Sequence, residues 1–274
     1  RSNLASSFRT GKINNKSFSF AIIERKIEMK SLVIIIFLTF LFIVPCYGTN
    51  YHVRPSTDCS YDGDGTTWAC ASAAGQPGAR KGFPTTLVRD NTYYVAAGTY
   101  GQTTLSTAVD GSKYIYIKKA TDDNHGIETG WESSFGSGQA VFSWTGGTTV
   151  GNVLTVKTSY FDIDGQTGGY PNWTSGHGFK VTTDNPKATL FCITHNGTGT
   201  AVAGYIHLHH TELAHTGRET NSLATGTYGP LVMSSDAPTG GSHSAGNHEF
   251  SYNYIHDSPA MLAWGYRPGS FIFE

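Results

Sequence analysis

The chain has 274 residues, and only 14% of them are charged, against about 25% in typical domains. Residues 49–274 carry 12 Lys and Arg against 18 Asp and Glu, a formal charge of −6. This part therefore lacks the clustered basic charge of a nucleic-acid-binding protein. Gly, Thr, Ser and Tyr are abundant instead, a composition typical of strands and turns.

The first 48 residues have the features of a leader followed by a secretory signal. Residues 1–28 precede the first methionine, Met29, and show little periodicity, so we interpret them as lying outside the natural protein. A basic start, an apolar run at 32–44 and a small residue at Gly48 predict a signal peptide over 29–48. The apolar run is shorter than the 20 or so residues of a membrane span, although an uncleaved N-terminal anchor is the alternative.

The remainder, residues 49–274, shows strand patterns and almost no helical periodicity. Short runs rich in β-branched and aromatic residues alternate with clusters of Gly, Asn, Asp and Ser, which predicts an all-β domain. The expected strands include residues 92–96, 114–118, 153–156, 160–164, 179–182, 205–209, 231–233 and 250–255.

An internal repeat relates several of these strands. Residues 160–165 match 205–210 and then 249–252, at offsets of 45 and 42 residues. We place the second strand of each unit at 211–216 and 253–258, and the third strand at 178–181, 229–233 and 261–264. Units that cannot bury an apolar face alone must stack, which predicts a parallel β-helix, a solenoid. An antiparallel sandwich is the alternative, but it should not repeat one strand order. The last residues read as the middle of a strand, so we interpret this domain as truncated at its C-terminus.

Residues 51–55, 62–68, 90–100 and 253–258 resemble segments of secreted right-handed β-helix proteins of the pectate-lyase-like superfamily. The resemblance covers about residues 50–274. It implies a right-handed parallel β-helix that is secreted or on the cell surface, with a polysaccharide or glycan as its partner. That superfamily includes lyases, hydrolases, epimerases and proteins without catalysis, so the resemblance does not name a reaction. We expect a monomer without a membrane span after signal removal.

Strand alternation and the repeat together place polar side chains in outward columns. Asp162, His207 and Glu249 are expected to form one column, and Asp164, His209 and Ser251 are expected to form the next. Adjacent parallel strands lie about 4.8 Å apart, so these groups would be close. We assign the first column to substrate binding, and Asp164 and His209 to a metal, with Ca²⁺ as the cofactor considered. The alternative is a solvated polar face.

Basic residues are the candidates for catalysis. Lyase chemistry on an acidic polysaccharide needs a cation or Arg to neutralise the uronate carboxylate and a base to remove the α-proton. The candidates are Lys180, Arg218 and Arg267, and Trp173 is a candidate sugar-binding plane. Lys180 as a solvated strand residue and Trp173 as a loop plug are the structural alternatives.

Cysteine and histidine spacing adds two expectations. Cys59 and Cys70 bracket a short loop and would form a disulfide in an oxidising compartment, whereas Cys192 lies in an apolar run and is expected to be buried. The histidines near His207 lack the spacing of known zinc motifs, so turn-capping roles are favoured. The sequence favours an extracellular lyase or hydrolase of acidic polysaccharide over a non-catalytic adhesion or sugar-binding protein.

Overall fold

The computed structural model describes residues 48–147, 149–170, 175–194, 203–216, 231–233, 247–257, 263–265 and 271–273. The predicted leader, and the predicted signal peptide up to residue 47, lie outside these residues. Gly48–Glu274 is one compact unit. Among the described residues, no helix has both the length and the apolar character needed to cross a membrane.

Three parallel sheets make up this unit, with a single short helix, α2 (Ser133–Gly136), among the described residues. Sheet A contains β1 (Asn50–Arg54), β2 (Arg80–Lys81), β3 (Thr92–Val95), β6 (Ile115–Lys119), β9 (Phe161–Asp164), β12 (Ile206–His209), β15 (His248–Ser251) and β18 (Phe271–Phe273). Sheet B contains β4 (Gly98–Tyr100), β7 (Ala140–Trp144), β10 (Phe179–Thr183), β13 (Thr211–His215) and β16 (Tyr254–His256). Sheet C contains β5 (Thr103–Leu105), β8 (Gly151–Val156), β11 (Ala188–Ile193), β14 (Leu231–Met233) and β17 (Ala263–Gly265).

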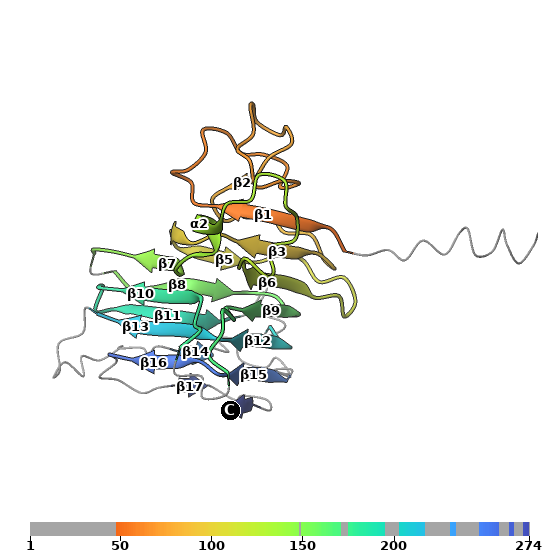
Figure 1. Ribbon diagram of the computed structural model, residues 1–274. Helices are drawn as coiled ribbons and strands as arrows, with labels where there is room; N and C mark the ends of the chain where they lie inside the picture. Colours follow the sequence, from red (N-terminus) through yellow and green to blue (C-terminus); the bar gives the residue numbers. More distant parts are fainter. Residues whose placement is uncertain are drawn as a thin grey trace, which may run out of the picture. The chain divides into compact units, whose positions relative to one another are not determined.

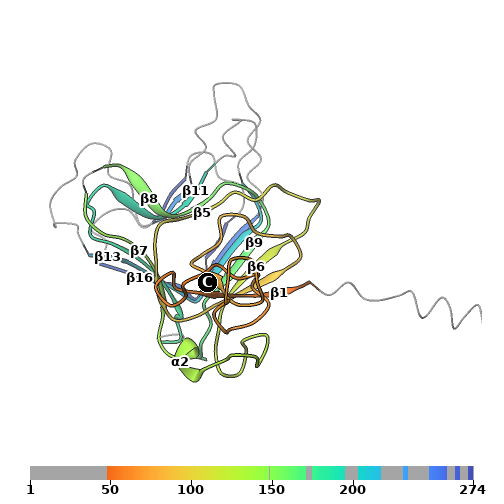
Figure 2. The same ribbon diagram turned by 90° about the horizontal axis from the view of Figure 1, so that it is seen from above.

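The chain visits the three sheets in a fixed rotation. From β3 onward the chain passes through sheet A, then B, then C, and each strand pairs in parallel with the third strand after it. Figure 1 shows the strands stacked one above another, and Figure 2 shows the three sheets surrounding a common interior. The expectation of an all-β chain with parallel strands is confirmed, because neighbouring strands of each sheet pair in parallel throughout the described residues.

The interior is built from columns of apolar side chains that run across the strands. In sheet A, Ile117, Ile163, Leu208 and Phe250 lie in register on adjacent strands, and each is at most 4% exposed. They belong to one continuous apolar cluster that includes side chains of all three sheets. Because inward and outward residues alternate along each strand, burying this column fixes which polar side chains face outward.

The position of β10 corrects one expectation from the repeat. Residues 178–181 were expected to form a third strand, but β10 lies in sheet B, where it pairs with the second strand β13. The third strand of that turn is β11, which pairs with β14. The reason is that residues 165–178 form an excursion between β9 and β10, whereas only His210 separates β12 from β13.

A left-handed residue turns the chain from sheet A into sheet B. His210 has φ 50°, and Tyr252 at the equivalent bend one turn later has φ 57°. This conformation costs a side-chain-bearing residue about 1–2 kcal/mol. The two rings stack with centroids 5.2 Å apart, and this contact offsets part of that cost.

The N-terminal end of sheet A is covered by a loop with its own small core. A disulfide joins Cys59 and Cys70 within this loop. Trp68 is fully buried, donates a hydrogen bond from Nε1 to the carbonyl of His125 at 2.9 Å, and packs against Trp131. Farther along the chain, Cys192 is buried in β11 as the sequence suggested.

Candidate functional site

The outward face of β9, β12 and β15 carries the polar row that the sequence predicted. His207 lies in register with Asp162 on one side and with Glu249 on the other. His209 lies between Asp164 and Ser251 in the same way. The row is ordered by strand pairing and by the buried apolar neighbours of each residue, so it does not depend on a flexible loop.

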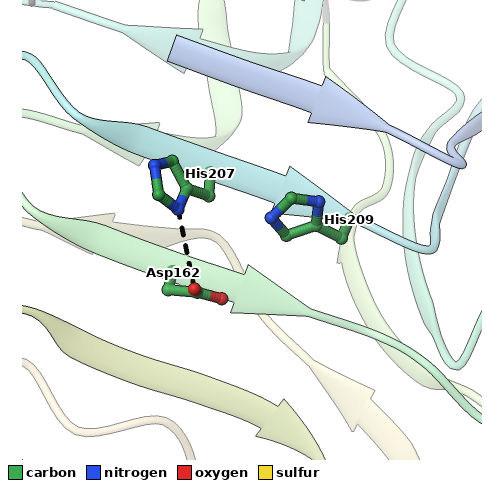
Figure 3. A group of neighbouring side chains, drawn as sticks. All are labelled: Asp162, His207 and His209. Carbon is green, nitrogen blue, oxygen red and sulfur yellow. Dashed lines mark ion pairs between the residues drawn. The ribbon is translucent and has the colours of Figure 1, made fainter. Parts of the chain in front are cut away.

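Three members of the row converge closely. Asp162, His207 and His209 each offer one potential ligand atom, and these atoms all lie within 4.8 Å of one another. The Nδ1 atom of His207 is 3.6 Å from Oδ2 of Asp162, and Figure 3 shows the two imidazoles side by side above the carboxylate. The half-buried side chains therefore form a compact set of two nitrogens and one carboxylate on a rigid surface.

One ring nitrogen of each imidazole contacts a hydroxyl group. The Nδ1 atom of His209 is hydrogen-bonded to Oγ of Ser251, which in turn donates to Oε1 of Glu249 at 3.3 Å. The hydroxyl of Tyr114, just before β6, lies 3.5 Å from Nε2 of His207, and the two rings are in contact. These contacts restrict the rotation of both histidine rings.

The electrostatic surroundings shift the two histidines in opposite directions. The Asp162 carboxylate raises the pKa of His207 above its ordinary value, against the opposing effect of burial. Burial lowers the pKa of His209, although Asp162 and Glu249 act against this shift. Near neutral pH, His209 is therefore a neutral imidazole with a nitrogen lone pair available to a proton or a metal ion.

Asp164, an expected metal ligand, is not part of the converging group. Its Oδ1 atom is 2.8 Å from Nδ1 of His210 and accepts a hydrogen bond from the backbone N–H of Gln166 at 3.0 Å. Burial alone would raise the pKa of Asp164, but the contacts with His210, Gln166 and His209 together outweigh it, and the pKa lies below its ordinary value. Asp164 thus holds the bend that leads into sheet B.

Lys180, an expected catalytic residue, lies on sheet B in an ion pair. Its Nζ atom is 2.6 Å from Oε1 of Glu212, and the same carboxylate accepts a hydrogen bond from Gln139 at 2.6 Å and contacts Nε2 of His256 at 3.0 Å. Burial opposes the ionisation of Glu212, but these three partners lower its pKa to about 2. The ammonium of Lys180 is therefore engaged in a contact between strands.

Three expected site residues lie outside the described part of the chain: Trp173, Arg218 and Arg267. Their roles in sugar binding and catalysis stay predictions. Tyr114 was not assigned to the site from the sequence, and Ser251 was placed in the column of Asp164 and His209 without a role of its own. A signal for Tyr114 was present, because β6 places Tyr116 in register with Asp162 and the ring of Tyr114, two residues earlier, stacks on that of Tyr116.

Comparisons with known proteins give no match of any kind. No protein-family model matches the chain. Neither a curated protein nor a solved structure matches it. The residues themselves must carry the functional argument.

Proposed function

We propose that the chain is an extracellular right-handed parallel β-helix that cleaves an acidic polysaccharide as a lyase or a hydrolase. The observation that carries this proposal is the row of Asp162, His207, His209 and Glu249 across three adjacent outward-facing strands. Such a row combines carboxylates and imidazoles, the groups most used for proton transfer. Strand pairing fixes their spacing, as positioning of a polymer requires.

The rotation of the chain through sheets A, B and C supports the β-helix part of the proposal. Stacked turns of this kind expose long polar faces at right angles to the strands. The disulfide between Cys59 and Cys70 supports secretion or display at the cell surface, because such bonds persist in oxidising compartments. A monomer is proposed.

The charge of the site limits how an acidic sugar can bind. Asp162 and Glu249 would repel a uronate carboxylate, and Lys180 of sheet B is held by Glu212. A bound divalent cation would neutralise the substrate, the role that the sequence suggested for Ca²⁺. Glu249 is left as the proton acceptor, because it lies beyond the converging group, is 36% exposed and receives a hydrogen bond from Ser251.

The test is cleavage of defined polymers. The full chain would be incubated with pectin, alginate, chondroitin and hyaluronan, with divalent cations or with a chelator. Ultraviolet absorbance of unsaturated uronates reports a lyase, and new reducing ends without absorbance report a hydrolase. We expect one polymer to be cleaved, with a loss of at least about 100-fold in Glu249→Gln.

A matched variant separates the site from general effects. Asp110→Asn changes an exposed carboxylate that pairs with Lys113 and should leave cleavage unchanged. If the folded protein cleaved no polymer, the proposal of an enzyme would be abandoned in favour of a glycan-binding or adhesive protein. Full activity in Glu249→Gln would remove this row from the mechanism.

A further inference from the structure

We propose that Asp162, His207 and His209 form a binding site for a divalent transition-metal ion of the Zn²⁺ type, with coordination positions left open to water or substrate. The proposal names the cation and its ligands within the row described above. The use of the ion in polysaccharide cleavage rests on the proposed function. Its binding depends only on the geometry of these three side chains.

The distances suit a metal ion after small side-chain adjustments. The three potential ligand atoms lie within 4.8 Å of one another, and Nδ1 of His207 is 3.6 Å from Oδ2 of Asp162. Zinc binds imidazole nitrogen and carboxylate oxygen at about 2.0–2.2 Å, so tetrahedral ligands lie about 3.3 Å apart. Rotation of the side chains closes this difference without movement of the strands.

The backbone places the ligands as a metal site requires. His207 and His209 are two residues apart on β12, so both face outward, and their ring centroids are 5.8 Å apart. Asp162 is paired with His207 on the adjacent strand β9. Figure 3 shows the three side chains facing a shared space on the surface of the sheet.

The hydrogen bonds of the imidazoles select the nitrogens that would bind the ion. Ser251 engages Nδ1 of His209, which leaves Nε2 for the metal. Tyr114 lies at Nε2 of His207, which leaves Nδ1, the atom nearest to Asp162. Metal-binding histidines commonly donate their second N–H to a partner that fixes the ring orientation, and both histidines have such a partner here.

The donor set distinguishes between metal ions. Ca²⁺ takes six to eight oxygen ligands, whereas two of these three ligands are nitrogens. Two imidazoles and one carboxylate are the protein ligands of several catalytic zinc sites, in which a further position holds water. Imidazole nitrogen also favours Zn²⁺ and Co²⁺ over Mn²⁺ in the usual affinity order. The site should therefore prefer Zn²⁺ to Ca²⁺ by a wide margin.

The test is direct metal binding by the full chain, first stripped with a chelator. Titration calorimetry with ZnCl₂ should show one ion per chain, and CoCl₂ should give the visible absorption of a four- or five-coordinate Co²⁺ site. Asp162→Asn and His207→Gln should each weaken binding by at least about tenfold, because each removes one of three ligands. Asp164→Asn is the matched control on the same strand and should bind Zn²⁺ like the unaltered protein. Circular dichroism would verify that each variant is folded.

Several results would overturn the proposal. These are the absence of saturable one-to-one Zn²⁺ binding, tighter binding of Ca²⁺ than of Zn²⁺, and loss of binding in Asp164→Asn with retention in Asp162→Asn. Metal binding without cleavage of any polymer would support this site and contradict the proposed function. Cleavage of a polymer by a protein that binds no metal ion would contradict this metal site and support the proposed enzymatic function.

Discussion

Glu212 is a single residue on which three strands of sheet B depend. Its carboxylate contacts Lys180 of β10, His256 of β16 and Gln139 just before β7. The side chain is 15% exposed, so these contacts are only partly screened by solvent. Their combined effect is the lowering of the Glu212 pKa to about 2.

This shift predicts how stability responds to acid. A carboxyl group with a lowered folded-state pKa stabilises the fold above the unfolded-state value near 4.5, and this contribution is lost as the pH falls towards 2. The contribution is roughly 1–3 kcal/mol, with allowance for solvent screening. Glu212→Gln should lower the unfolding free energy by about that amount at pH 7. It should also flatten the decline between pH 4.5 and 2 in urea unfolding experiments.

Glu132→Gln provides the comparison, since Glu132 is exposed and its described side-chain contact is a long hydrogen bond from Ser134 at 3.5 Å. This variant should follow the unaltered protein across the acid range. An equally steep decline in Glu212→Gln would show that the carboxylate does not carry the acid sensitivity.

The site shows at the same scale what sequence reasoning can and cannot reach. Asp162, His207 and Glu249 were predicted to share a column, because period-two alternation and an equal offset between repeats fix the register. The choice between Asp162 and Asp164 as partner of the histidines was not accessible. That choice depends on side-chain rotation at the bend, where Asp164 is hydrogen-bonded to His210 instead.

At the scale of whole elements, the strands and their register were largely predictable, but one sheet assignment was not. The repeat placed 211–216 beside 253–258, and β13 does pair with β16. It misplaced β10, because the length of the excursion from 165 to 178 hides the equivalence between β10 and β13. The free energy of folding changes little with the length of a surface loop, so repeats can differ in loop length and their equivalence is hard to see in the sequence.

Gly165 shows why the start of that excursion tolerates no side chain. A Cβ atom at this position would lie 2.3 Å from the carbonyl oxygen of His210 and 2.7 Å from the backbone nitrogen of Phe179. His210 belongs to the next turn and Phe179 begins β10 of the same turn, and neither backbone atom can move aside cheaply. Gly165→Ala should therefore lower the unfolding free energy by about 1–3 kcal/mol, measured by urea denaturation.

Gly101→Ala is the matched control for this prediction. A Cβ atom there would meet nothing within 4 Å, so the change should stay within about 0.5 kcal/mol. Equal effects of the two substitutions would mean that the close approach of adjacent turns at Gly165 does not limit stability.

At the scale of the molecule, stacked parallel turns leave an exposed edge wherever a sheet stops. Sheet A extends beyond β3 through β1 and the two-residue β2. The loop that carries Cys59, Trp68 and Cys70 lies next to this edge, and His52 of β1 donates hydrogen bonds from its backbone N–H and from Nδ1 to the carbonyl oxygen of Gly65 in that loop. Unpaired strand edges promote association between chains, so this loop protects the monomer that we propose.

The disulfide between Cys59 and Cys70 should make this protection durable. It closes a segment with a sequence separation of 11 residues, which corresponds to about 2–3 kcal/mol in chain-entropy estimates. Replacement of both cysteines by Ser should lower the urea midpoint and increase light scattering on warming, because β1 loses its cover before the inner turns unfold. Reductant should have the same effect on the unaltered protein and none on the double Ser variant. If the double Ser variant unfolded and scattered like the unaltered protein, the loop would hold through Trp68 and its aromatic neighbours alone, and the edge of sheet A would not need the disulfide.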